Sequence, residues 1–222
     1  GNILNHKSDI LEIIDEKSST NQVIANLVIG SKSGITDNIS MIPRANENCF
    51  WVIDVCQMRT TQKLINNLLR LNCMVMLTGS KFYQSPPFCG ALLVPKSISS
   101  KLVNIQDSAI EPFLKIFSTS DIPLNHPKLR SKFRHNENYG TLLRWEAAIS
   151  EMKLLSFFGE DMVTMAVDRW NAFIISQLQI KSSYFELMPD QQFTNRSIVS
   201  FNVKHPDGSL LSDEELRVLY LD

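Results

Sequence analysis

The stretch that decides the fold is Cys73-Met-Val-Met-Leu-Thr-Gly-Ser-Lys-Phe-Tyr-Gln-Ser-Pro-Pro-Phe-Cys-Gly-Ala-Leu-Leu-Val-Pro95. Two short apolar segments, Cys73–Leu77 and Ala91–Val94, stand on either side of a polar turn, and this pattern predicts two strands. Lys81 stands at the end of the first predicted strand. In an arbitrary protein such a lysine is a solvated charge, so its interest depends on the neighbouring segments.

A second buried strand is predicted upstream, at Phe50-Trp-Val-Ile-Asp-Val-Cys-Gln57. Thr60–Leu71, which has leucines on one face, is predicted to be the crossover helix between the two strands. Parallel strands buried on both faces read as continuous apolar runs, and ligands of such sheets bind beyond the carboxyl ends. We therefore expect one crevice to hold Asp54, Gln57, Thr78 and Lys81.

The order Asp-x-x-Gln, helix, strand and Thr-x-x-Lys resembles the cofactor half of a fold-type-I pyridoxal phosphate enzyme. Within that group it is similar to the class V branch, which includes cysteine desulfurases, kynureninase and related aminotransferases. The resemblance runs from about Val23 to the end of the chain and is most specific over Asp54–Pro95. It implies an α/β large domain, with a mostly parallel sheet and one antiparallel strand, followed by a small α+β domain.

The resemblance assigns the two catalytic residues. Lys81 would form the Schiff base with pyridoxal 5'-phosphate, which requires a neutral amine in a partly desolvated place. Asp54 would hold the proton on the pyridine nitrogen, so that the cofactor can act as an electron sink.

Four further residues are carried over as cofactor contacts. Gln57 resembles the glutamine that meets the phenolic oxygen, and Thr78 resembles the hydroxyl that meets the phosphate. Ser80 departs from the family pattern, which often has His before the lysine. Thr141, in Tyr139-Gly140-Thr141, resembles the threonine that reaches the phosphate of the other subunit in a dimer.

The cysteines limit both the cellular compartment and the class of reaction that the sequence predicts. Cys49, Cys56, Cys73 and Cys89 have neither zinc-ligand spacing nor the pattern of a disulfide framework, which favours a reducing, cytoplasmic location. A desulfurase needs a cysteine on a mobile loop in the carboxyl-terminal part, and none follows Cys89. An aminotransferase-like reaction on an amino acid is therefore favoured over desulfuration, and elimination, decarboxylation and racemisation stay open.

The alternative to an enzyme is a protein without catalytic activity. A degenerate form of the same fold would be a structural or interaction subunit without catalysis. It is supported by the departures from the family pattern at Ser31–Ser33 and Ser80.

The predicted organisation is residues 1–117 as the carboxyl-terminal half of the large domain, 118–140 as a linker and 141–222 as a truncated small domain. The family's amino-terminal half, with its phosphate cradle and stacking ring, is not in the sequence. We therefore expect a fragment that is inactive alone and acts in a homodimer or with a chain that supplies that half. A net charge of -1 argues against nucleic-acid binding. The sequence contains no run of about 18 apolar residues, so no membrane span is predicted.

The remaining elements follow from periodicity. Helices are predicted at Ile3–Glu16, Ser97–Asn104, Leu142–Phe157 and Glu160–Gln179, and the apolar positions of the last one are expected to be core. Strands are predicted at Val23–Ile29, Tyr184–Leu187 and Ile198–Lys204. Ser212-Asp-Glu-Glu215 predicts a capping box that starts a final helix.

Overall fold

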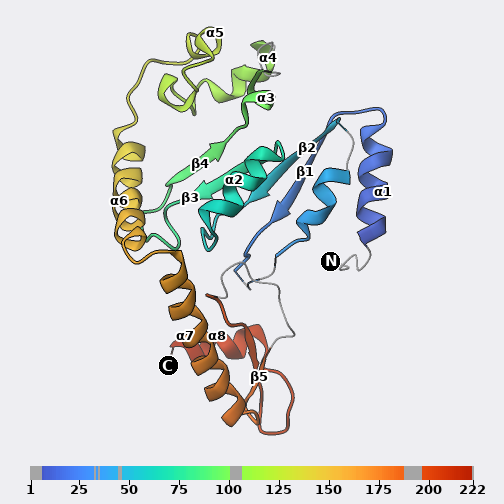
Figure 1. Ribbon diagram of the computed structural model, residues 1–222, viewed down its shortest axis with the longest axis vertical. Helices are drawn as coiled ribbons and strands as arrows, with labels where there is room; N and C mark the ends of the chain where they lie inside the picture. The colour runs from blue at the N-terminus through green and yellow to red at the C-terminus, as the bar shows by residue number, and fades with distance from the viewer. Residues whose placement is uncertain are drawn as a thin grey trace.

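A four-stranded sheet forms the centre of the computed structural model, which describes residues 7–32, 34, 36–44, 47–100, 107–187 and 197–221. Its strands are β1 (Val23–Val28), β2 (Cys49–Asp54), β3 (Met74–Thr78) and β4 (Gly90–Leu93), paired in that order (Figure 1). β1, β2 and β3 are parallel, and β4 is antiparallel to β3. The predicted α/β fold with one antiparallel strand is therefore confirmed.

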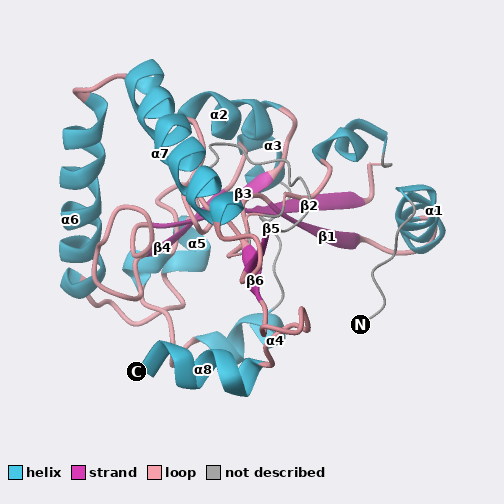
Figure 2. Ribbon diagram, turned by 90° about the horizontal axis from the view of Figure 1, so that it is seen from below, coloured by secondary structure: helices cyan, strands magenta, loops and turns pink. Residues whose placement is uncertain are grey.

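Helices surround this sheet. α1 (Lys7–Ser18) and α6 (Tyr139–Ser156) lie at opposite ends of it, beyond β1 and β4 respectively (Figure 2). The 3-10 helix η1 (Ile39–Arg44) connects β1 to β2, and α2 (Gln62–Arg70) is the predicted crossover from β2 to β3. α2 begins at an N-cap, Thr61, whose side-chain oxygen accepts the backbone N–H of Leu64.

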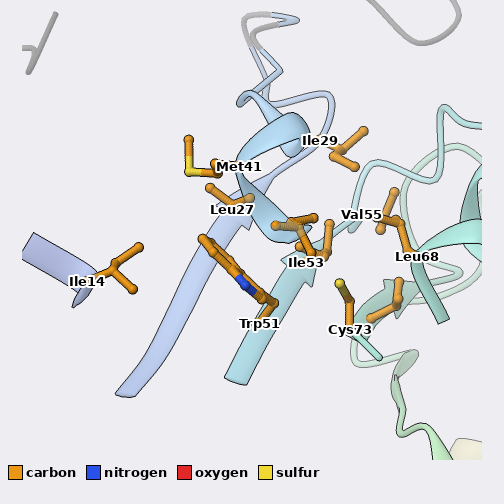
Figure 3. Packing of buried hydrophobic residues seen from close by; sticks show 11 residues of the cluster. Ile14, Leu27, Ile29, Met41, Trp51, Ile53, Val55, Leu68 and Cys73 are labelled. Carbon is orange, nitrogen blue, oxygen red and sulfur yellow. The ribbon is translucent and has the colours of Figure 1, made fainter. Parts of the chain in front are cut away.

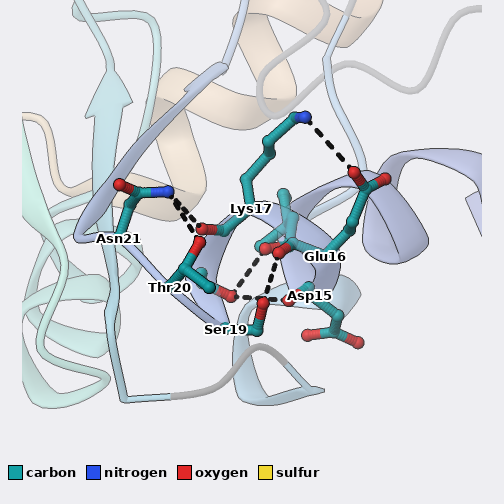
Figure 4. A network of polar contacts seen from close by, with 8 residues as sticks. Asp15, Glu16, Lys17, Ser19, Thr20 and Asn21 are labelled. Atoms are coloured by element: carbon teal, nitrogen blue, oxygen red, sulfur yellow. Dashed lines mark hydrogen bonds and ion pairs between the residues drawn. The ribbon is translucent and has the colours of Figure 1, made fainter.

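The carboxyl end of α1 is closed by its own polar side chains (Figure 4). The Ser19 hydroxyl donates to the carbonyl oxygen of Glu16 at 2.6 Å, and the Asn21 amide donates to that of Lys17 at 3.3 Å. These bonds satisfy carbonyls that the last helical turn leaves without partners. The chain can therefore turn directly from α1 into β1.

The hydrophobic core lies between the sheet and its helices (Figure 3). Ile53, Cys73 and Val75 are completely buried, and Leu68 of α2 is 1% exposed. The second face of β2 and β3 is partly buried, because Val52, Met74 and Met76 are half-buried, and this explains why the apolar runs of these strands are continuous. The other core members are Ile14, Leu27, Ile29, Met41, Ile42, Trp51 and Val55.

The segment between β4 and α6 contains more helix than we predicted. α3 (Lys96–Ser99) is the start of the helix expected at Ser97–Asn104, of which residues 101–104 lie outside the described part. α4 (Asp107–Ile110) and the 3-10 turn η3 (Glu111–Phe113) follow.

The predicted linker itself, expected to be irregular, holds η4 (Thr119–Asp121) and α5 (Pro127–Arg130). Local chemistry explains both: a capping box joins Ser118 and Asp121, and Pro127 occupies the first helical position, where no N–H is needed.

The carboxyl-terminal part pairs two long helices with a second, small sheet. α6 leads into α7 (Glu160–Ile180), and β5 (Phe185–Leu187) pairs antiparallel with β6 (Phe201–Val203). α8 (Asp213–Leu221) follows. The predicted capping box is confirmed, because the Ser212 N–H and hydroxyl both donate to the Glu215 carboxylate at 2.8 Å.

The prediction that the apolar positions of α7 are core is wrong for most of them. Met162, Met165, Trp170 and Phe173 are between 46% and 62% exposed, whereas Leu178 is buried. The periodicity identifies an apolar face correctly, but within the described residues most of that face has nothing packed on it. No helix in these ranges is long and apolar enough to cross a lipid bilayer.

The core predicts a large stability difference between two leucines at the end of α2. Leu68→Ala removes a side chain that is 1% exposed and should lower the free energy of unfolding by about 2–5 kcal/mol. Leu71→Ala is the matched control, because Leu71 is 46% exposed, and it should change stability much less. Urea denaturation followed by circular dichroism measures both, and equal losses would contradict this description of the core.

Candidate active site

The carboxyl ends of the three parallel strands lie at one edge of the sheet. Asp54, the last residue of β2, is in register with Val28 of β1 and Met76 of β3. The Val55 N–H donates to the Met76 carbonyl at 3.0 Å, so the pairing continues one residue beyond β2. Thr78 ends β3 two residues after Met76. The structure thus brings the ends of the Asp54 and Lys81 strands together.

A tight turn follows β2, and Gln57 lies in it. We predicted that the strand would run to Gln57, but it ends at Asp54. The Asp54 carboxylate accepts the backbone N–H of Cys56 at 2.8 Å, and the Met58 N–H donates to the Val55 carbonyl at 2.7 Å. An aspartate that bonds the backbone two residues on favours a turn over a continued strand.

Lys81 is the first residue of a second tight turn. The Gln84 N–H donates to the Lys81 carbonyl at 3.1 Å, with Phe82 and Tyr83 as the central residues. The wider loop from Gly79 to Cys89 is closed by the Gly79 N–H, which donates to the Cys89 carbonyl at 2.9 Å. Lys81 is exposed, so its amine is presented outward by a loop with a fixed base.

Thr78 and Ser80 form a hydroxyl pair under this loop. Thr78 is 9% exposed and donates to the Cys89 carbonyl at 2.6 Å, while the Ser80 hydroxyl lies 2.9 Å from the Thr78 hydroxyl. In this arrangement the Thr78 proton stabilises the loop. Ser80, which is half-buried, extends the polar surface from Thr78 toward Lys81.

The Cys56 thiol connects the two predicted catalytic residues electrostatically. Burial raises the pKa of Cys56 to about 12, and a hydrogen bond to Asp54 and the Asp54 charge act in the same direction. The charge of Lys81 acts on the same thiol in the opposite direction. Asp54 and Lys81 therefore lie close enough to Cys56 for both charges to be felt there.

Thr141 lies near the start of α6, on a face of the helix that packs against the Lys81 loop. Its N–H donates to the side chain of the N-cap, Asn138, at 3.1 Å. Four and seven positions further on, Trp145 donates to the Gly90 carbonyl at 3.3 Å and Ala148 packs against Gly79. Residues at this spacing share a helix face. Thr141 therefore lies on the same face of α6 as these two contacts, one turn before Trp145, and its reach to the phosphate of another subunit stays a prediction.

Sequence reasoning missed two residues at this edge, Cys56 and Arg59. Arg59 follows the β2 turn, and its guanidinium lies over the ring of Phe82, immediately after Lys81. The only signal in the sequence was proximity to Asp54, which does not distinguish an inward arginine from a solvated one.

The fold is similar to that of part of a solved enzyme structure, and this likeness concerns the fold alone. No known family model and no curated protein matches the sequence. Among solved structures, the chain is similar to the apo structure of a cysteine desulfurase from Thermococcus onnurineus NA1, with a TM-score of 0.58 and 15% identity. The match covers 96% of this chain and 50% of that one, so the chain spans half the length of the desulfurase. The predicted fold resemblance is confirmed.

The contact between Gly79 and Ala148 predicts a paired effect of substitution. A Cβ added at Gly79 would lie 2.4 Å from the Ala148 Cβ and 2.9 Å from the Cys89 sulfur. Gly79→Ala should therefore displace α6 and destabilise the fold by about 1–3 kcal/mol. Ala148→Gly in the same chain should recover part of this loss, despite the roughly 1 kcal/mol that glycine costs inside a helix. Thermal unfolding of both single variants and the double variant tests the contact. If the stability changes of the two single variants simply add in the double variant, the contact is contradicted.

The charges around Cys56 predict opposite shifts of its pKa. Asp54→Asn removes a group that raises the pKa and should lower it, whereas Lys81→Met removes a charge that lowers the pKa and should raise it. The measurement is the pH dependence of Cys56 alkylation by iodoacetamide, read by mass spectrometry. Cys49, whose pKa is raised by burial and Asp15, is the internal control. Shifts of the same sign in both variants would show that Asp54 and Lys81 do not flank the thiol.

Proposed function

We propose that this chain supplies the lysine-bearing part of a pyridoxal-phosphate-dependent enzyme that acts on an amino acid by an aminotransferase-like reaction. The observation that carries the proposal is the pairing of β2, which ends at Asp54, with β3, which leads to Lys81, so that the two residues follow strand ends at the same edge of the sheet. They lie beyond the carboxyl ends of parallel strands, where open α/β sheets bind their ligands. The likeness of the fold to a cysteine desulfurase supports the same assignment.

The described residues fit the cofactor at Asp54 and only in part at Lys81. Asp54 presents a half-buried carboxylate whose orientation is fixed by the Cys56 N–H, as a partner for a protonated ring nitrogen requires. Lys81 carries an exposed amine on a loop with a closed base, so an aldehyde can reach it, but the described residues do not supply the partly desolvated place that a neutral amine requires. Gln57 and Ser80 are proposed as further polar contacts. A phosphate role for Thr78 would require its hydroxyl to release the Cys89 carbonyl.

When bound, pyridoxal phosphate withdraws electrons from the Cα of an attached amino acid. In the proposed mechanism, Lys81 would hold the cofactor through its amine and would move a proton at the Cα of the substrate amino acid. Asp54 maintains the positive charge of the ring nitrogen, and the protonated Cys56 thiol holds the Asp54 carboxylate in place. Thr141 is proposed to contact the phosphate from its face of α6, in its own chain or across a dimer.

A second candidate is an interaction subunit of the same fold without catalysis. The specific observation in its favour is the apolar surface of the carboxyl-terminal helices, where Phe157 is 83% and Tyr220 is 89% exposed. An enzyme should turn yellow on addition of pyridoxal phosphate, whereas a pure interaction subunit should stay colourless.

The site predicts where the cofactor attaches. Borohydride reduction of the intact protein with pyridoxal phosphate should place the label on Lys81, found by mass spectrometry of proteolytic peptides. Lys81→Arg should remove the label, whereas Lys96→Arg, at the start of α3, should leave it unchanged. Recovery of the label on another lysine, with Lys81 unmodified, would refute the assignment.

Asp54→Asn tests the proposed role of Asp54 at the ring nitrogen of the cofactor separately from attachment of the cofactor to Lys81. This variant should still be labelled at Lys81 but should turn over an amino acid about 10- to 100-fold more slowly, because a hydrogen bond to a charged group is worth about 1.5–3 kcal/mol. A wild-type rate would show that Asp54 is not the partner of the ring nitrogen.

The exposed apolar helices predict the behaviour of the 222-residue chain alone. We expect it to bind pyridoxal phosphate weakly, to lack turnover and to self-associate, since contiguous apolar surface of this kind mediates association. Light scattering should show a mass above that of a monomer, and Phe157→Ser with Phe158→Ser should lower it. A monodisperse monomer with micromolar cofactor affinity and aminotransferase activity would overturn this expectation.

A further inference from the structure

Arg59 joins two parts of the chain that are far apart in sequence. Its Nη1 donates to the Ser197 hydroxyl at 2.9 Å, and this bond connects the turn after β2 to the segment that leads into β6. The other side of the contact is Phe82, whose ring centroid is 5.4 Å from the Arg59 Cζ. A guanidinium within about 6 Å of a ring is held there by the cation–π attraction.

The backbone directs Arg59 into this position. Met58, immediately before it, has a φ of 52°, in the left-handed region, and its side chain is 7% exposed. The turn at Met58 is closed by its N–H, which donates to the Val55 carbonyl at 2.7 Å, and it directly follows the turn in which the Asp54 carboxylate accepts the Cys56 N–H. The place of Arg59 is thus set by the same backbone that sets Asp54.

Phe82 transmits the contact to the lysine. It is the residue next to Lys81 and the first central residue of the turn that Lys81 opens. It also packs edge-on against Tyr83, with the ring centroids 5.2 Å apart. Movement of the Phe82 ring would therefore rotate the turn from which the Lys81 side chain projects.

We propose that Arg59 is a positioning residue that fastens the segment at Ser197 to the Lys81 turn, so that the placement of the carboxyl-terminal β5–β6 unit is sensed at the lysine. Burial lowers the pKa of Arg59, in keeping with a guanidinium held between packed surfaces. The functional meaning of this link rests on the function proposed above, but the link itself holds without cofactor.

Amide hydrogen exchange of the cofactor-free protein tests the link. Arg59→Met keeps an apolar side chain but removes the cation and the donor, and it should raise exchange about tenfold in two segments together, 82–85 and 197–203. Arg59→Lys retains the charge over Phe82 and should restore most of the protection at 82–85. Arg70→Met is the matched control, because Arg70 is an exposed arginine of α2, and it should alter neither segment.

The reactivity of Lys81 separates positioning from general stability. Acetylation of Lys81 by acetic anhydride, measured against Lys63 in the same sample, should change its pH profile in Arg59→Met and return toward wild type in Arg59→Lys. Ser197→Ala should shift the pH profile of Lys81 acetylation in the same direction as Arg59→Met. The double variant should shift this profile little more than Arg59→Met alone.

Two outcomes would overturn the proposal. One is exchange that rises in only one of the two segments, and the other is a Lys81 profile unchanged in Arg59→Met. Neither depends on cofactor binding, so the link can fail while the borohydride experiment succeeds, or hold while it fails.

Discussion

The hydrogen bond between the Val55 N–H and the Met76 carbonyl is the constraint on which the site depends. It extends the pairing of β2 and β3 one residue past the end of β2, while β3 continues to Thr78, so that both chains leave at the same edge of the sheet. From there the Asp54 carboxylate turns one chain at Cys56, and the Gly79–Cys89 bond closes the loop of the other. A slip of one residue between these strands would reverse the faces of their side chains, and the ends of the Asp54 and Lys81 strands would lose their present register.

The sequence predicted the central sheet well because one buried face and one partly buried face together place apolar residues at almost every position of a strand. β2 and β3 are continuous apolar runs, and the crossover helix has its leucines on one side. The observed elements therefore differ from the predicted ones only in the residues at which they begin and end. The turn at Gln57 was missed because it depends on where the Asp54 carboxylate points. That orientation is decided by a bond to the Cys56 backbone and not by any propensity of the segment.

From the sequence, we could predict which residues lie at the ends of the strands, but not the contacts that these residues make. The edge at which Asp54, Thr78 and Lys81 gather follows from parallel topology, and the structure places their strand ends there. The roles of these residues stay predictions. Arg59 and Cys56 were beyond sequence reasoning, since their importance comes from contacts with Ser197, Phe82 and Asp54. α7 illustrates the converse limit, because its periodicity identifies an apolar face but not what covers that face.

The protonated state of Cys56 has a consequence for the oxidative chemistry of the chain. With a pKa of about 12, on the order of one molecule in 10⁵ would carry the thiolate at neutral pH. Peroxide and disulfides react with the thiolate, so this half-buried cysteine is chemically quiet although it is next to an exposed lysine. A thiolate in the same place would add readily to aldehydes that reach the amine. Burial retains the proton on the Cys56 thiol, with the Asp54 carboxylate acting in the same direction, so the thiol does not compete as a nucleophile at this edge of the sheet.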